Sequence, residues 1–473
     1  MANKNLLTLS NFNLGGISDS KYQGIDNSMA TLVGFDLHSE PGILKVNQRL
    51  VSDPAGGSDA IDGFIKTIVP CSDGNTYFFS STSGKIWKRD PTSLVYALMH
   101  TAIPGAGSAN ITGATEFNGY LYWATESRVG RWQIGTTWAG ANDAYAIFTN
   151  TDDTYHPMLV KNNTLYIGDK YYIAQINSAH AFTANALDIP TYYRIKSLGQ
   201  TISDLLIGTI SASNVASTQI FRWNTWAVSW STIDQVPEVG INSFLASDNE
   251  VYVQVGTKGN MYRYNGYQLQ QFKRIPGDWT STKKAVVHPD ASANFGGQLL
   301  FGLSNSSGNP ALQGVYTLGA YSSNYPRVLS LDYIISAGVS TGIEIGSIAA
   351  IGDDVLVSWK NGSNYGVDRI DWANKYSGAY MESRMINVSR DELKDYEVTI
   401  GYRTVPTGTS ISIYASKNHE AYSLVSTEVD AVKKSVRSTV NIAGAATLQI
   451  KIATTANGNN APEIESVDIR LKT

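Results

Sequence analysis

The chain repeats one short pattern seven times, and this repeat limits the possible folds more than any other feature. Each copy, such as "NNTLYIGDKYYIAQIN", has a tight turn, a β-forming run, a small polar connector and a second run carrying Trp, Tyr, Arg or Lys. Successive copies are 45, 44, 41, 45, 49 and 56 residues apart when they are marked by Asp73, Asn118, Asn162, Ser203, Asp248, Gly297 and Asp353. A spacing of roughly 40 to 50 residues is typical of a four-stranded propeller blade.

The residue types within each copy also fit a blade. Asn-Gly, Asp-Gly and Asn-Asn adopt positive φ easily, so each marker is predicted to be the hairpin turn between a blade's inner strands. The run that follows, such as "TYFF" or "VLVSW", is apolar nearly throughout, as expected of a strand covered on both faces by neighbouring blades. In the quoted copy, Thr164 to Gly168 is predicted to be an inner strand and Tyr171 to Asn177 the next strand outward. Gly168-Asp169-Lys170 is then a connector and not a ligand loop.

The repeat and its flanks predict an all-β protein with three parts. Residues 1–59 form an N-terminal arm or strand segment, in which "GILKVNQRLV" could supply the outer strand of a closing blade or belong to an arm that reaches a neighbouring subunit. Residues 60–376 form an approximately seven-bladed β-propeller, with six or eight blades left open by the long last units. Residues 377–473 contain alternating runs such as "TSISIYASKN" between turns and are predicted to form a C-terminal β-sandwich.

Composition narrows the class of protein further. Only 16% of residues are charged and the formal net charge is -4, which argues against a broad basic face that grips nucleic acid. The single cysteine, Cys71, excludes an internal disulfide and indicates folding in a reducing cytoplasm. The start lacks the apolar core of a secretory signal, and no run approaches the ~18 apolar residues of a membrane span.

Searches for catalytic and metal-binding motifs return little. The six histidines include no pair at i, i+4, and neither an EF-hand run nor a G-x-S-x-G elbow is present. Gly84-Lys85-Ile86 fails as a phosphate loop, because that loop needs a glycine at Phe79 and a hydroxyl at Ile86. We therefore predict no catalytic, cofactor-binding or metal-binding residue, and no enzymatic activity.

Three weaker patterns each have a structural explanation that we favour. "SDGNTYF" is similar to a sialidase Asp-box, but Asp73-Gly74 is better explained as a hairpin turn. "TDDTYHP" brings together Asp152, Asp153 and His156, which could bind a divalent ion, but a blade-connecting loop is the simpler interpretation. Trp223, Trp226 and Trp230 could form a sugar platform, but burial between blades is favoured.

The two ends of the chain resemble virion proteins of tailed bacteriophages. Asn13-Leu14-Gly15-Gly16, Gly34-Phe35-Asp36 and Pro41-Gly42-Ile43-Leu44-Lys45 match a Gly-Gly segment followed by "N-x-D-x...G-x-L-x-K/R", with Gly34 where asparagine is commoner. "GAYMESRMINV", "YRTVPTGTSISIYASKN" and "VDIRL" are similar to the C-terminal sandwich of tail hub or nozzle (tail tubular) proteins of short-tailed phages. Chain length and domain order agree with that family.

This resemblance implies a non-enzymatic structural protein of the virion tail. The family forms a ring, expected to be hexameric, that contacts adaptor, fibre and other tail proteins and through which DNA is held and ejected without specific binding. A slightly acidic chain suits such a conduit, since each phosphate contact would have to be broken during passage. Localisation is expected in the virion after folding in the host cytoplasm. The residues proposed to lie near subunit or domain contacts are Tyr22, Phe35, Leu44, Tyr380 and Arg384.

Two other function classes stay open. A carbohydrate-active propeller predicts two acidic side chains in the central mouth and turnover of host polysaccharide. A receptor- or glycan-binding module of a tail or fibre predicts saturable binding without turnover and an exposed region from Trp223 to Trp230.

Overall fold

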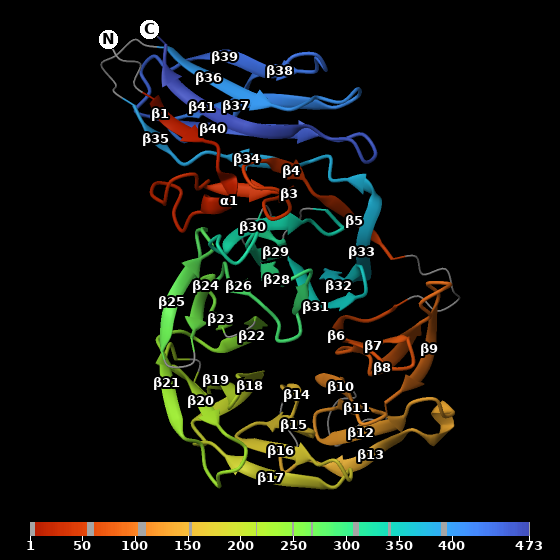
Figure 1. Cartoon of the computed structure of the whole chain (residues 1–473). Coiled ribbons are helices and arrows are strands. Elements are labelled where there is room, and N and C mark those ends of the chain that lie inside the picture. Colours follow the sequence, from red (N-terminus) through yellow and green to blue (C-terminus); the bar gives the residue numbers. More distant parts are fainter. Residues whose placement is uncertain are drawn as a thin grey trace.

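The computed structural model describes residues 5–53, 61–102, 110–150, 154–213, 215–247, 250–265, 268–305, 312–338, 342–388 and 395–472. Its regular structure in these residues is almost entirely β-strand, with one short helix α1 (Phe12–Gly15) and one 3-10 turn η1 (Trp138–Gly140). A ring of small sheets lies beside a second β domain, as Figure 1 shows. The all-β prediction, with a propeller followed by a sandwich, is confirmed.

The ring consists of seven sheets, numbered here as blades 1 to 7 in chain order. Blade 1 is formed by β6 (Ile65–Pro70), β7 (Thr76–Ser80), β8 (Lys85–Arg89) and β9 (Tyr96–Thr101). Blade 2 is formed by β10 (Gly113–Phe117), β11 (Tyr120–Ala124), β12 (Arg128–Gln133) and β13 (Asn142–Ile147). Blade 3 is formed by β14 (Met158–Lys161), β15 (Thr164–Asp169), β16 (Tyr172–Ile176) and β17 (Phe182–Asp188).

Blades 4 to 7 continue the ring. Blade 4 is formed by β18 (Tyr193–Gln200), β19 (Leu205–Ser211), β20 (Thr218–Trp223) and β21 (Thr232–Val236). Blade 5 is formed by β22 (Ile241–Ser247), β23 (Glu250–Val255), β24 (Asn260–Tyr264) and β25 (Leu269–Arg274). Blade 6 is formed by β26 (Ala285–Val286), β27 (Ser292–Phe295), β28 (Gln298–Asn305), β29 (Gly314–Gly319) and β30 (Val328–Tyr333). Blade 7 is formed by β31 (Ile343–Ile351), β32 (Asp354–Asn361), β33 (Asn364–Lys375) and β5 (Gln48–Ser52).

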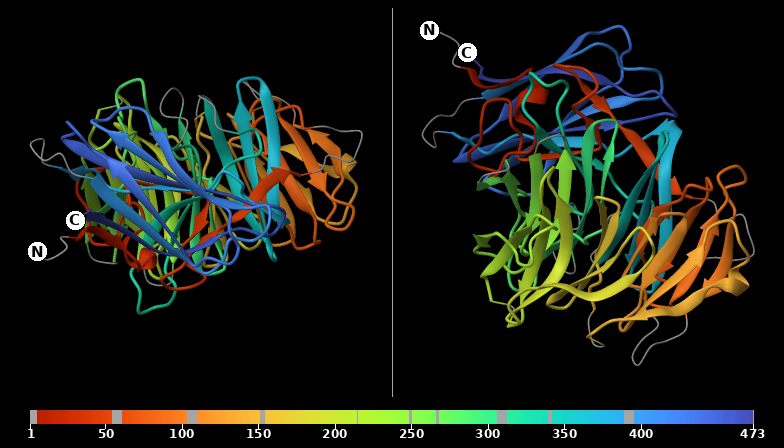
Figure 2. Two further views of the ribbon diagram at one scale, coloured as in Figure 1. Left: turned by 90° about the horizontal axis from the view of Figure 1, so that it is seen from above. Right: turned by 60° about the horizontal axis from the view of Figure 1, so that its bottom comes forward.

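The first strand of each blade lies nearest the centre of the ring, except in blade 6, where β27 takes this place after the short β26. The strands β6, β10, β14, β18, β22, β27 and β31 contact one another in that order around it (Figures 1 and 2). The marker turns join the first and second strands, as predicted, with φ of 50° and 54° at Asn162 and Asn163 and 81° at Gly74. The marker Asp248 lies outside the described residues. The second strands are buried, and β7 is buried along its whole length. The repeated marker turns therefore lie together at one end of the propeller.

The N-terminal segment divides between the two domains. Within the run Gly42 to Val51, β4 (Leu44–Val46) pairs with the last strand of the sandwich, whereas β5 pairs antiparallel with β33 as the outer strand of blade 7. The expectation of an outer strand thus applies to residues 48–52 only. The described residues before it pack against their own chain, through β1, β3 and β4 among others. Contact of this segment with a neighbouring subunit stays a prediction.

The residue that follows β5 links blade 7 to blade 1. The Asp53 carboxylate accepts hydrogen bonds from Arg89 Nε at 2.6 Å, Arg89 Nη2 at 3.1 Å and the Tyr96 hydroxyl at 2.6 Å. Arg369 of β33 lies 3.3 Å from the same carboxylate. The Asp53 side chain is fully buried and that of Arg89 is 6% exposed. First and last blades are therefore joined by a buried ion pair as well as by strand pairing.

The second domain is a sandwich of two antiparallel sheets. One contains β1 (Asn5–Leu9), β3 (Phe35–Asp36), β4, β41 (Glu463–Leu471), β36 (Asp395–Tyr402) and β39 (Ser435–Asn441). The other contains β34 (Tyr380–Glu382), β35 (Ile386–Asn387), β40 (Thr447–Thr455), β37 (Ser410–Lys417) and β38 (Ser423–Glu428). The strand β2 (Thr31–Val33) pairs with β30 of blade 6 on one side and with β34 on the other, so one sheet runs without interruption from propeller to sandwich.

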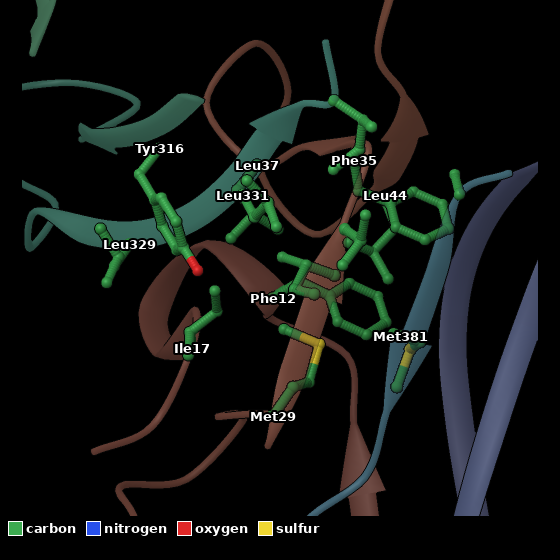
Figure 3. Packing of buried hydrophobic residues seen from close by; sticks show 14 of the residues in the cluster. Phe12, Ile17, Met29, Phe35, Leu37, Leu44, Tyr316, Leu329, Leu331 and Met381 are labelled. Atoms are coloured by element: carbon green, nitrogen blue, oxygen red, sulfur yellow. The ribbon is translucent and has the colours of Figure 1, made fainter. Parts of the chain in front are cut away.

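A continuous hydrophobic core fills the junction between the two domains. Phe12, Met29 and Phe35 of the N-terminal segment converge with Leu331 of blade 6 and Met381 of the sandwich, as Figure 3 shows. All five side chains are between 0% and 1% exposed. Burying aromatic and aliphatic side chains of this size stabilises a fold by roughly 1.5 to 3 kcal/mol each. We call this region the joint core.

A polar cluster is buried at the edge of the joint core. His38, on the segment after β3, lies 3.4 Å from the Ser330 hydroxyl, which in turn donates a hydrogen bond to Asp332 of β30. Burial raises the pKa of Asp332 to about 8, and burial lowers the pKa of His38 to about 4. Asp332 therefore keeps its proton in the folded chain at neutral pH, whereas it ionises once the chain unfolds.

This cluster gives a pH prediction. Between about pH 6.5 and 8, the folded chain holds a proton on Asp332 that the unfolded chain does not, so the free energy of unfolding falls as pH rises. Below pH 6.5, His38 contributes the opposite sign, because the unfolded chain then binds the extra proton. The free energy of unfolding of the parent should fall by about 1 to 2 kcal/mol between pH 6.5 and 8 because of Asp332, and this fall should be absent in Asp332→Asn. Urea unfolding at both pH values tests this, and equal slopes in variant and parent would contradict it.

Candidate functional site

Three of the innermost strands carry a β-bulge at a polar residue. The pairing register skips Lys66 in β6, Lys196 in β18 and Asn242 in β22. An extra residue in one strand is left unpaired and re-aims its side chain, which is why bulges recur beside functional sites. Each of the three follows an isoleucine and precedes Thr or Ser, as "IKT", "IKS" and "INS".

The hydroxyl residue after each bulge explains half of this pattern. Ser197 donates a hydrogen bond to the Ile241 carbonyl of blade 5 at 2.9 Å, and Ser243 donates to the Pro289 carbonyl before blade 6 at 3.1 Å. Thr67 donates to the Asp290 carboxylate at 2.6 Å. The hydroxyls thus join neighbouring segments around the axis, while Lys66 and Lys196 are left pointing inward.

Lys66 and Lys196 line a cavity of about 410 Å³, which we call the central cavity. Its lining residues lie at the end of the propeller opposite the marker turns, where the chain enters the innermost strands. It is lined by Lys66, Ser81, Asn110, Thr112, Glu126, Thr154, Tyr155, His156, Pro157, Lys196, His288, Pro289 and Asp290. These residues come from blades 1, 2, 3, 4 and 6, so only a closed ring assembles the cavity.

The electrostatics of the central cavity are dominated by burial. Burial lowers the pKa of Lys196 to about 8, and the neighbouring Lys66 charge adds to that shift. Burial also lowers the pKa of Lys66, which Glu344 partly offsets. Burial raises the pKa of Asp290 to about 6 against the hydrogen bond from Thr67. Clusters of shifted groups in a concave site are typical of binding or catalysis.

His288 connects the cavity to a second charged group. Its Nε2 lies 3.5 Å from Glu344, and Lys360 lies 3.5 Å from the same carboxyl group. The neighbouring His288 ring holds the pKa of Glu344 down to about 2, whereas burial lowers the pKa of His288. Glu344 is therefore an anion already matched by these neighbours.

The described end of the motif "TDDTYHP", from Thr154 to Pro157, lines this cavity. His156 is fully buried and stacks on Phe148 at 4.2 Å, with its ring nitrogens 2.7 Å from the Gly168 carbonyl and 3.3 Å from the Glu126 carbonyl. Asp152 and Asp153 lie outside the described residues. In the described part of the chain, no three His, Cys, Asp or Glu side chains form a group that could hold a metal ion.

The other two weak patterns are also resolved. Asp73-Gly74 is a hairpin turn in which the Asp73 carboxylate accepts from the Asn75 amide at 3.0 Å. Trp223 is 3% exposed and packs between blades, as predicted, but Trp226 is 85% exposed on the loop between β20 and β21, so the prediction of burial is wrong for it. That loop continues past the end of β20, and Trp226 and Trp223 form no shared platform.

The five candidate contact residues fall into two groups. Phe35 and Leu44 are 0% exposed in the core between propeller and sandwich, so they lie at a contact between the domains of their own chain. Tyr22 is 52% exposed, and Tyr380 is half-buried with Lys451 Nζ 3.9 Å from its ring centre. Arg384 donates to the Gly24 carbonyl at 2.7 Å, which ties β34 and the following segment to the N-terminal loop.

Motif searching missed the central cavity for a specific reason. Its two lysines lie 130 positions apart and meet only because the ring closes. A usable signal was present, because Lys66 and Lys196 each precede a marker turn by seven residues within Ile-Lys-Thr or Ile-Lys-Ser. A charged residue at the same place in two blades is unexpected for a buried strand.

Comparisons with known proteins bear on the fold only. No protein family and no curated protein sequence matches the chain. The extracellular domain of a hybrid two-component system from B. thetaiotaomicron is similar at 14% identity and a TM-score of 0.46, over 82% of this chain and 47% of that one. U3-55K is similar at 11% identity and a TM-score of 0.44, over 68% and 98%.

A third similar structure is YCF48 from Cyanidioschyzon merolae, at 9% identity and a TM-score of 0.43, covering 68% of this chain and 98% of that chain. The chain thus spans about half the length of the bacterial extracellular domain and nearly all of the two smaller proteins. Among the helices in the described residues, none is long and apolar enough to cross a membrane.

Proposed function

We propose that this protein is a non-enzymatic structural component of a bacteriophage tail, a hub or nozzle subunit of a ring that forms part of the DNA ejection conduit. One observation carries the proposal. The N-terminal residues that resemble the phage family are the residues that build the joint core and its surroundings. The resemblance therefore concerns the part of the chain that holds propeller and sandwich together.

The glycines of that segment show why its amino-acid sequence is restricted. A Cβ at Gly15 would lie 2.1 Å from the Asn27 carbonyl oxygen, and a Cβ at Gly16 would lie 2.8 Å from the Leu329 carbonyl oxygen. Gly16 also has φ of 58° and Gly34 has φ of 71°, where other residues are strained. A sequence that packs a short helix between blade 6 and a sandwich needs glycine at these places. Sharing them favours a shared architecture.

The junction between propeller and sandwich suits a subunit that transmits force. One sheet and one core cross from propeller to sandwich, so the angle between the domains is set by many buried contacts. A rigid wedge with different surfaces on its two sides can close a ring through heterologous contacts. Tyr22, Tyr380 and Arg384 lie on the side where the N-terminal loop meets the sandwich, and we assign that side to contacts with neighbouring subunits or with adaptor and fibre proteins.

Position in the particle is the deciding test. We expect the purified chain to form rings, six-fold by the family resemblance, in negative-stain electron microscopy, alone or with its adaptor. We also expect gold-labelled antibody to mark the tail axis of intact particles. A protein that forms no ring under either condition and labels only fibre tips would exclude a hub or nozzle and leave the receptor-binding alternative.

A second function has one observation in its favour. Glu126 and Asp290 both line the central cavity, which is where a carbohydrate-active propeller would place its carboxyl pair. Asp290, with a pKa near 6, would be the proton donor and Glu126 the partner. This alternative expects host-envelope polysaccharide to be degraded by the parent protein. It also expects Glu126→Gln and Asp290→Asn each to reduce that turnover by at least about 100-fold. No degradation by the parent would exclude it.

A further inference from the structure

We propose that the central cavity binds a small molecule bearing an oxyanion, either a carboxylate or a phosphate group, and that Lys66 and Lys196 hold that group. The proposal goes beyond the structural role above and does not require it. It assigns a ligand class to a site built by the ring itself.

The two lysines reach the cavity from opposite sides of the ring, one from blade 1 and one from blade 4. Both are the unpaired residue of a β-bulge, so their backbones are distorted at the same place for the same result. A bulge that only adjusted strand twist would need no cation. Repeating a lysine at both positions places two ammonium groups around one space of about 410 Å³, a volume within the range of small-ligand sites.

Among the described residues, neither ammonium group forms an ion pair within 4.0 Å, although the Glu344 charge acts on Lys66 from farther away. Lys196 Nζ donates to the Asn242 side-chain oxygen at 2.6 Å and lies 5.8 Å from the Tyr155 ring centre. Lys66 Nζ lies 5.8 Å from the ring centre of Phe64, and Lys360 Nζ lies 5.8 Å from the same ring centre. Two half-buried cations that repel each other are unfavourable in an empty site, and an anion between them would relieve that repulsion.

The acidic groups of the cavity are partly engaged elsewhere. Asp290 accepts from Thr67 across the axis, and the nearby Glu344 is paired with His288 and Lys360. The Glu126 and Asp290 carboxylates, together with Thr112 and Ser81, can accept hydrogen bonds from ligand hydroxyls. A free phosphate would use the lysines alone, whereas an acidic monosaccharide would use both sets of groups.

The pH dependence follows from the lysines. An anion favours the charged form of Lys196, so binding should weaken as pH rises through about 8, where this lysine loses its proton. The titratable groups that face it are Lys66, Tyr155, Glu126, His288 and Asp290. Asp290 and His288 change charge below neutral pH, so a loss above pH 8 is attributable to the lysines.

Isothermal titration calorimetry of the full chain at pH 7 tests the site with three probes: inorganic phosphate, glucuronate and uncharged glucose. We expect phosphate or glucuronate to bind and glucose not to bind. Tighter glucuronate binding would identify an acidic sugar as the natural class, and phosphate binding alone would identify a free anion. If neither anion binds at millimolar concentration, or if glucose binds equally well, the proposal is wrong.

Lys66→Met and Lys196→Met should each weaken anion binding by about 10-fold to 100-fold, the value of a hydrogen bond to a charged group. The matched control is Lys258→Met, because Lys258 is exposed on the turn after β23. Removing a buried unpaired charge should leave thermal stability unchanged or higher, so folding can be verified on the same samples. Formation of the proposed ring of subunits should be unaffected in all three variants. Unchanged anion affinity in both cavity variants would overturn the assignment.

Discussion

Asp53→Ala is expected to destabilise the protein by about 3 to 5 kcal/mol and to open the propeller between blades 7 and 1. The substitution leaves the buried Arg89 guanidinium without its two carboxylate bonds and the Tyr96 hydroxyl without its acceptor. An uncompensated buried charge costs more than the ion pair contributes, which makes the expected loss large. Hydrogen exchange should report it locally, as faster exchange in β5, β33, β8 and β9.

The control is Arg49→Ala on the same strand. Arg49 forms a 2.9 Å ion pair with Asp371, but its side chain is 47% exposed, so the expected loss is about 0 to 1 kcal/mol. Both variants remove one member of an ion pair that joins β5 or its end to the propeller, and they differ mainly in burial. Equal, small losses of thermal stability in both would show that the Asp53 contact does not hold the ring closed.

Phe35→Ala is expected to destabilise the protein by about 3 to 5 kcal/mol through the cavity it leaves in the joint core. Phe35 is 0% exposed and packs where the N-terminal segment, blade 6 and the sandwich meet (Figure 3). Urea unfolding should show the loss, and exchange should rise in β2, β30 and β34 together, because these strands share one sheet.

Tyr22→Ala is the matched comparison, since both aromatic residues were predicted to lie near contacts. Tyr22 is 52% exposed, so its removal should change the free energy of unfolding by no more than about 1 kcal/mol. Its expected effect is instead to reduce formation of the proposed ring of subunits. If Phe35→Ala left stability intact and abolished only assembly, Phe35 would be a subunit contact and the joint core would be misassigned.

The sequence predicted the repeating part of the fold well because nearly all strand pairs within a blade join residues close together in the sequence. Turn residues such as Asn162-Asn163 and the apolar runs after them determine hairpins over a few residues, and the markers lie between first and second strands wherever the structure describes them. The division of the run Gly42 to Val51 at Asn47 was beyond such reasoning. Its two halves pair with β33 and β41, more than 300 residues later in the chain, and either half alone is an ordinary β pattern.

The central cavity was equally hidden, for a different physical reason. Catalytic motifs consist of residues close together in the sequence, whereas Lys66 and Lys196 are brought together by closure of the propeller and lie at β-bulges. Conversely, the motif that seemed most chemical, "TDDTYHP", contributes a histidine that is held by backbone carbonyls and an aromatic stack.

The strand that completes blade 7 is among the first parts of the chain to be synthesised and among the last to find its partner. Ser52 pairs with Asp368, more than 300 residues later, so at roughly 5 to 20 residues per second β5 waits on the order of 15 to 60 s on the ribosome. A chain that terminates early has no β33 to receive it and keeps an open edge that aggregates or is degraded. Only a chain that extends through β33 can therefore close the propeller, and a cell can degrade shorter copies in which blade 7 is incomplete.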